Sequence, residues 1–231
     1  GSRVRGRLQP GGDLSIAAPD GLLVPEAPTS TPKDGPGNSG GLETGLPPFY
    51  QHVQQEHPGR PVETWFQDES RFGQQGTLTR VWAKRGSRPT AVRQTEYQWV
   101  WLYGAVNPQT GESMGMVATA TDTEMFNVYL DMLGRQIGPD RHVILVLDQA
   151  GWHLAKNLNV PANITLHHLP AYSPELNAIE RLWLWIKDHE LSNRIYQTQS
   201  HLWQAGMQAW LTLTPERIKS VCRTDWLPRN D

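Results

Sequence analysis

From residue 62 onward, short runs of β-branched and aromatic residues alternate with stretches whose apolar residues recur at helical spacing. The segment 96–106 (EYQWVWLYGAV) has the composition of a strand. Asn, Pro and Gly at 107–111 supply turn residues, so 96–106 and 113–119 are predicted to form a hairpin. Further strands are predicted at residues 62–67, 78–84, 142–147 and 164–169.

Helical spacing begins after the hairpin. Asp122 or Thr123 is predicted to cap a helix that ends at Gly138 and Pro139, with apolar residues on one face. A second long helix is predicted to open at Ser173, because Pro174 suits the first helical position. Shorter helices are predicted at 151–158, near 199–211 and near 214–223.

The order of these elements indicates the fold class. Antiparallel strands come first and strand–helix units follow, which predicts an α/β fold with a mixed sheet flanked by helices. This order resembles the ribonuclease-H-like arrangement, in which the first strand lies beside the strand that follows the first helix. Asp68 and Asp148 end those two strands, so we expect their carboxylates to lie close together.

Composition changes sharply along the chain. Residues 1–49 hold 10 of the 21 glycines and 8 of the 18 prolines but none of the ten tryptophans. Such a segment buries too little apolar surface to offset its ordering entropy. We therefore predict a disordered leader at 1–49, either a natural linker or a segment foreign to the domain, followed by one domain at 50–231.

Charge and cysteine content exclude several classes of protein. The formal net charge of −2 argues against a histone-like basic protein and against an acidic disordered tail. A single cysteine, Cys222, excludes an intrachain disulfide framework and a cysteine-rich zinc module. No apolar run is long enough to cross a bilayer and no signal peptide is evident, so the expected compartment is the cytoplasm.

Three acids form the candidate site. Asp68 and Asp148 each stand where an apolar strand meets a loop, and Glu180 borders the apolar stripe of the long helix. Any one of them, taken alone, is most simply a solvated residue. Three carboxylates at one sheet end suit two Mg²⁺ or Mn²⁺ ions, which are hard cations that prefer oxygen ligands and promote phosphodiester transfer.

Four segments carry a resemblance to a known family. They are residues 65–72 (WFQDESRF), 80–89 (RVWAKRGSRP), 147–153 (LDQAGWH) and 169–180 (LPAYSPELNAIE). In this order they resemble the motifs of the DDE transposases, in the bacterial insertion-sequence branch of the mariner-type superfamily. The resemblance runs from about residue 62 to 227, and its last motif is the most specific.

The resemblance implies a function and a set of site residues. Asp68, Asp148 and Glu180 would hold the two metal ions that serve DNA strand cleavage and strand transfer. The partners would be double-stranded DNA at element ends and target, with a homodimer as the active complex in the bacterial nucleoid. Gln149 replaces the Asn common in the family, and the 31 residues between Asp148 and Glu180 are slightly few for it. The family's N-terminal helix-turn-helix region is not evident.

Other polar residues have candidate supporting roles. His153 is expected either to contact a phosphate or orient the metal site, or to serve as a structural histidine at a helix start. Asn177 lies one helical turn before Glu180 and is expected to support its carboxylate. A segment with five cations and no acid is expected to contact DNA phosphates, or else to form a solvated face. Its cations are Arg80, Lys84, Arg85, Arg88 and Arg93.

Three other functions remain open from the sequence. A ribonuclease-H-like nuclease without strand transfer needs the same fold and the same acids. A relic or domesticated nucleic-acid-binding protein would be inactive, although all three acids are retained. A two-carboxylate glycosidase explains neither the third acid nor the basic segment.

Overall fold

The structure, a computed structural model, describes residues 40–76, 79, 83–86, 94, 96–224 and 227. The chain divides into two compact units. Pro32–Thr79 and Ala91–Asp231 form one unit, which contains every helix and strand named below. Gly1–Thr31 and Arg80–Thr90 form the other, of which residues 83–86 are described.

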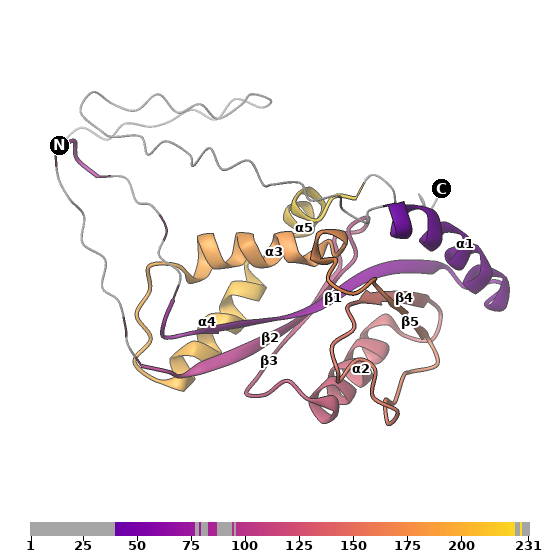
Figure 1. Ribbon diagram of the computed structural model, residues 1–231, viewed down its shortest axis with the longest axis horizontal. Helices are drawn as coiled ribbons and strands as arrows, with labels where there is room; N and C mark the ends of the chain where they lie inside the picture. The colour runs from indigo at the N-terminus through magenta and orange to yellow at the C-terminus, as the bar shows by residue number, and fades with distance from the viewer. Residues whose placement is uncertain are drawn as a thin grey trace. The chain divides into compact units, whose positions relative to one another are not determined.

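A five-stranded sheet forms the centre of the larger unit, in the order β3-β2-β1-β4-β5 (Figure 1). β1 is antiparallel to β2 and parallel to β4, as expected for a mixed sheet in which β1 and β4 are adjacent. The strands are β1 (Val62–Gly73), β2 (Trp99–Val106), β3 (Ser113–Ala118), β4 (His142–Leu147) and β5 (Ile164–His168). The predicted hairpin and the predicted adjacency are both confirmed.

Helices cover both faces of the sheet. α2 (Thr123–Ile137) packs on one face, against a cluster that includes Trp65 and Tyr103. The other face packs against the remaining helices, which lie across the sheet from α2 (Figure 1). These are α1 (Gly40–Glu56), α3 (Ile179–Ile186), α4 (Gln199–Leu211) and α5 (Pro215–Val221).

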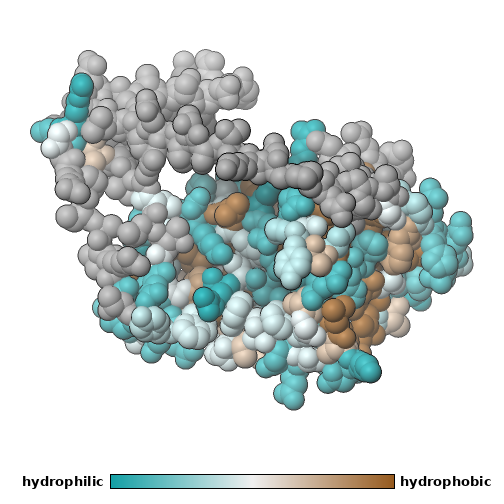
Figure 2. Space-filling model, in the orientation of Figure 1, coloured by the Kyte–Doolittle hydropathy of each residue, from teal (hydrophilic) through white to brown (hydrophobic). Residues whose placement is uncertain are grey.

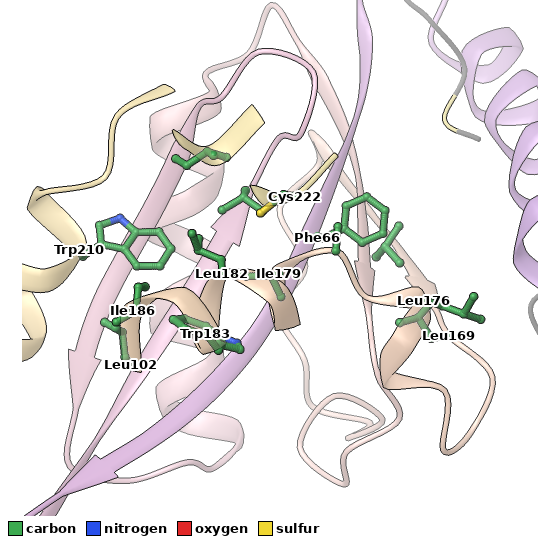
Figure 3. Close-up of a cluster of buried hydrophobic side chains, with 14 of the residues drawn as sticks. Phe66, Leu102, Leu169, Leu176, Ile179, Leu182, Trp183, Ile186, Trp210 and Cys222 are labelled. Atoms are coloured by element: carbon green, nitrogen blue, oxygen red, sulfur yellow. The ribbon is translucent and has the colours of Figure 1, made fainter. Parts of the chain in front are cut away.

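α3 is held firmly against the sheet. Ile179, Leu182, Trp183 and Ile186 are each no more than 2% exposed, and Figure 3 shows them directed into the buried cluster. Complete burial of one such side chain contributes about 1.5–3 kcal/mol of transfer free energy. The amphipathic pattern of the sequence therefore determines the position of any residue that α3 carries.

The predicted domain boundary at residue 50 is wrong for the last part of the leader. α1 begins at Gly40, and Leu46 and Val53 are buried in the core. Tyr50 also anchors the helix, because its hydroxyl donates a hydrogen bond to the Val62 carbonyl at 2.8 Å. Residues 1–39 lie outside the described residues, so their predicted disorder stays a prediction.

The long helix predicted from Ser173 is interrupted. A 3₁₀ turn, η1 (Pro174–Leu176), is followed by a break at Asn177, and α3 begins at Ile179. The chain continues from α3 into a π-helical turn, η2 (Lys187–Leu191). Glu180 therefore lies in the first turn of α3, and not two turns inside one continuous helix.

The helix predicted at 151–158 is wrong, since this segment forms turns. Local hydrogen bonds from polar side chains compete with a helix. The Asp148 carboxylate accepts one from the Ala150 amide, and Asn127 of α2 bonds to the backbone of Asn157 and Asn159. Most of the strand predicted at 78–84 lies outside the described residues.

Hydrophilic side chains predominate on the face shown in Figure 2, and hydrophobic ones form smaller groups. Among the described residues, no helix combines the length and the apolar character that crossing a membrane requires.

Candidate active site

The three predicted acids line one cavity of about 380 Å³. Asp68 lies two residues beyond the last β1–β4 pair, and Asp148 follows the end of β4 directly. Glu180 approaches from the first turn of α3. The parallel pairing of β1 and β4 thus brings Asp68 and Asp148 to the same edge, where α3 adds the third carboxylate.

Asp68 is held by a tryptophan. The Trp183 indole Nε1 donates a hydrogen bond to Asp68 Oδ2 at 2.9 Å. Gly104 pairs with Asp68 across the sheet, and a Cβ at Gly104 would lie 2.7 Å from Cη2 of Trp183. The glycine therefore leaves the space that the indole ring occupies.

The pKa of Asp68 is raised to about 8. Burial is the largest cause, and the negative charges of Glu180, Glu69 and Asp148 add to it. In the absence of a cation, the folded protein therefore favours the protonated form of this carboxyl group at neutral pH.

Asp148 is in a different environment, with its side chain 54% exposed. Its Oδ1 accepts hydrogen bonds from the Ala150 amide at 3.0 Å and from His153 Nδ1 at 2.7 Å. The bond from His153 lowers the pKa of Asp148 below its ordinary value. Asp148 is thus ionised at neutral pH.

Glu180 is placed by the turn that precedes it. The Asn177 side chain donates a hydrogen bond to the Gln67 carbonyl at 2.9 Å and so ties the start of α3 to β1. Asn177 was expected to support the Glu180 carboxylate, but its side-chain amide bonds to the backbone of β1. Burial raises the pKa of Glu180, and the charge of Lys187 opposes that shift.

His153 links the site to the opposite face of the sheet. Its ring is fully buried, with Nδ1 at Asp148 and Nε2 3.1 Å from Glu69 Oε1. Burial alone would lower the pKa of His153, but the hydrogen bonds with Asp148 and Glu69 outweigh it and raise the pKa to about 9. The alternative of a helix-start histidine is wrong, since residues 151–158 form no helix.

Glu69 was missed by the sequence reasoning. Strand alternation places it on the face of β1 opposite to Asp68, so its position in the strand does not point to the site. The signal that was available is its spacing, since a second acid stands next to Asp68 and a histidine follows Asp148 by five residues.

The departure at Gln149 has a structural account. Gln149 Nε2 donates a hydrogen bond to the Leu169 carbonyl at 2.8 Å, which ties the segment after β4 to the segment after β5. Both segments line the cavity. The longer side chain thus makes a backbone contact within the site.

The basic segment is only partly described. Arg80, Arg88 and Arg93 lie outside the described residues. Lys84 and Arg85 are exposed and belong to the smaller unit. Their contact with DNA stays a prediction.

The residues that line the cavity fit hard divalent cations. The three acids offer carboxylate oxygens, the ligands that Mg²⁺ and Mn²⁺ prefer. Mutual repulsion among these carboxylates contributes to the raised pKa of Asp68, and a bound cation would relieve it. Within the described part of the chain, no three His, Cys, Asp or Glu side chains already surround one ion position.

Comparisons with known proteins identify relatives. The family model described as "DDE superfamily endonuclease" matches residues 63–203. The uncharacterized protein y4pE/y4sA of Sinorhizobium fredii is 40% identical over 134 residues, which are 57% of this chain and 99% of that protein.

Two solved structures have a similar fold. The Mos1 strand transfer complex matches with a TM-score of 0.51 and 15% identity, over 78% of this chain and 56% of that one. The Mos1 transposase paired-end complex matches with a TM-score of 0.52 and 14% identity, over 76% of this chain and 55% of that one. The predicted ribonuclease-H-like fold class is confirmed. This chain spans just over half the length of these chains.

Proposed function

The chain belongs to the DDE superfamily endonuclease family, and from that premise we propose that it is the catalytic domain of a DNA transposase. One observation carries the proposal. Asp68, Asp148 and Glu180 come from three separate parts of the chain and line the same cavity, and the segments that carry them resemble the family's three acidic motifs.

The three carboxylates would hold two Mg²⁺ or Mn²⁺ ions. When bound, such a pair stabilises the negative charge that develops at a phosphodiester undergoing displacement. Asp148, ionised through its bond with His153, offers a charged ligand before any ion arrives. Asp68 is kept in place by Trp183 and loses its proton as the site gains positive charge.

The proposed reaction has two displacements at phosphorus. Water attacks a phosphodiester at the element end, and the bond to the 3′ oxygen breaks to leave a free 3′-hydroxyl. That hydroxyl then attacks a phosphodiester of the target DNA and displaces a second 3′ oxygen. The number of phosphodiester bonds is conserved in the second step, so it needs no further cofactor.

The partners in this proposal are double-stranded DNA, at element ends and target, and a second copy of the chain. The basic segment would contact phosphates through Arg80, Lys84, Arg85, Arg88 and Arg93, a contact that positions DNA without reading its sequence. Such a protein would act at the chromosome, in the bacterial nucleoid.

Cleavage and joining by the purified chain test the proposal. Labelled duplexes from the element ends are incubated with the chain and Mn²⁺ or Mg²⁺, and nicked and joined products are both scored. Glu180→Gln should abolish both products. Glu175→Gln, an exposed acid near the same turn, is the matched control and should retain both.

Each result has a clear meaning. Nicking without joining would favour the alternative of a nuclease without strand transfer. A wild-type chain that binds no Mn²⁺ in calorimetry and yields no product would contradict the proposal and favour an inactive relic.

A further inference from the structure

A chain of hydrogen bonds runs from Asp148 through His153 to Glu69. His153 Nδ1 lies 2.7 Å from Asp148 Oδ1, and its Nε2 lies 3.1 Å from Glu69 Oε1. The side chains of His153 and Glu69 are 0% and 3% exposed. A carboxylate of the cavity is therefore connected to an acid on the far face of the sheet.

The His153 ring faces a carboxyl group at each of its nitrogens, Asp148 at Nδ1 and Glu69 at Nε2. Trp152 Nε1 lies 3.1 Å from His153 Nε2 and 3.3 Å from Glu69 Oε2. The indole N–H therefore contacts both His153 and the Glu69 carboxyl group.

Glu69 is itself firmly held. Its Oε1 accepts a hydrogen bond from Gln67 Nε2 at 2.8 Å, and its Oε2 accepts the one from Trp152. The His153 ring also packs against the Phe126 ring, with the centroids 4.5 Å apart. Fixed neighbours of this kind set both the plane of the imidazole and which of its nitrogens carry protons.

The consequence reaches Asp148. Two donors, His153 Nδ1 and the Ala150 amide, converge on Oδ1. Among the described residues, no donor bonds to Oδ2, which is available to a ligand in the cavity. Without Glu69 at Nε2, the ring loses one of the two hydrogen bonds that fix its plane, and with it the direction from which Nδ1 meets the Asp148 carboxylate.

We propose that Glu69 is a positioning residue, which acts through His153 to orient the Asp148 carboxylate toward divalent cations. The inference rests on the proposed function, since it assigns the metal to that same cavity. It adds an acid from outside the triad, on the other face of the sheet, to the machinery of the site.

Direct Mn²⁺ binding to the purified chain, measured by calorimetry without DNA, tests the proposal. In Glu69→Gln the shape is kept, but the new amide donor must face either Trp152 or the Gln67 and His153 donors. We expect Mn²⁺ affinity to fall about tenfold, the lower end of losses from outer-shell substitutions at metal sites. Glu124→Gln removes the same charge from an exposed position on α2 and should bind Mn²⁺ as the wild type does.

A second variant separates positioning from a general structural role. His153→Phe keeps a ring beside Phe126 and removes both donors, so its loss of Mn²⁺ affinity should be at least as large. In that background Glu69→Gln should have almost no further effect, because Glu69 acts only through His153. Independent structural damage would instead add in the double variant. His153→Phe also serves as the test if Glu69→Gln melts below the assay temperature.

The outcomes distinguish this inference from the proposed function. Wild-type Mn²⁺ affinity in either single variant, or additive losses in the double variant, would overturn the positioning role and leave the transposase proposal intact. A wild-type chain that does not bind Mn²⁺ would overturn both.

Discussion

Asp68 and Asp148 lie at the ends of adjacent strands and line the same cavity, yet their surroundings shift their pKa values in opposite directions. Asp68 is partly buried beside other carboxylates, receives a neutral indole donor and has a pKa raised to about 8. Asp148 is half exposed, is bonded to a histidine with a raised pKa and has a lowered pKa.

The difference shows how one site meets two requirements. A carboxylate that is already charged attracts a cation from solution, whereas a carboxyl group that ionises only beside positive charge limits repulsion in the metal-free protein. Asp148 meets the first requirement and Asp68 the second. Three fully charged acids in one cavity would destabilise the fold.

The largest expected effect comes from replacing the carboxyl groups of Asp68 and Asp148 one at a time. Asp68→Asn and Asp148→Asn should each reduce DNA cleavage by about a thousandfold or more, the scale of losing a group that stabilises transition-state charge. The two substitutions should change the stability of the metal-free protein in opposite directions. Asp148→Asn loses a charge-assisted hydrogen bond, so its free energy of unfolding should fall by about 1 kcal/mol at this exposure. Asp68→Asn should melt at the wild-type temperature or above it.

Thermal melting in EDTA, combined with a cleavage assay, measures both quantities. Equal losses of stability in the two variants would show that the two carboxyl groups have the same charge in the metal-free protein. That result would contradict the opposite pKa shifts of Asp68 and Asp148.

A smaller effect should follow from the donor that holds Asp68. Trp183→Phe removes the indole N–H and should lower cleavage about tenfold, the scale of losing a group that hydrogen-bonds to a metal ligand. Trp210→Phe is the matched control, because its ring packs against Trp183 at a tilt, with the centroids 5.8 Å apart, and lies over Gly115 without bonding to Asp68. Comparable cleavage by the two variants would assign the loss to packing and not to the bond.

The smallest effect is on pH dependence. A folded-state pKa of about 8, far above the ordinary value, means that folded Asp68 binds more protons than unfolded Asp68 between about pH 4 and 8. Its contribution to the free energy of unfolding is therefore present at low pH and is lost as pH rises toward 8. In EDTA, the melting temperature of the wild type should fall relative to that of Asp68→Asn between pH 5 and 8, and saturating Mn²⁺ should reduce the difference. Parallel curves in EDTA would contradict the raised pKa.

Much of the sheet could be predicted from sequence, because strand and helix periodicities are local and the order of elements restricts the topology. The pairing of β1 with β4, and with it the meeting of Asp68 and Asp148, followed from that order. α1 was missed because the glycine and proline content of residues 1–49 predicted disorder, whereas Leu46 and Val53 are buried in the core.

The remaining differences depend on contacts between distant residues. Asn177 bonds to Gln67, 110 residues away, and the helix predicted from Ser173 is interrupted at that asparagine. The role of Glu69 depends on His153, which reaches it because residues 151–158 form turns and not a helix. Single-sequence patterns carry no information on such pairs.

Gly104 and Gly115 lie very close to the rings of Trp183 and Trp210, and this limits which substitutions these positions can accept. Gly104 and Gly115 pair across β2 and β3, and a Cβ on Gly115 would lie 2.4 Å from the Trp210 ring, as one on Gly104 would collide with Trp183. The four positions therefore form a size-matched set. In homologues, a larger residue at either glycine should occur only with a smaller ring opposite it, so these positions should covary with one another and tolerate single substitutions poorly.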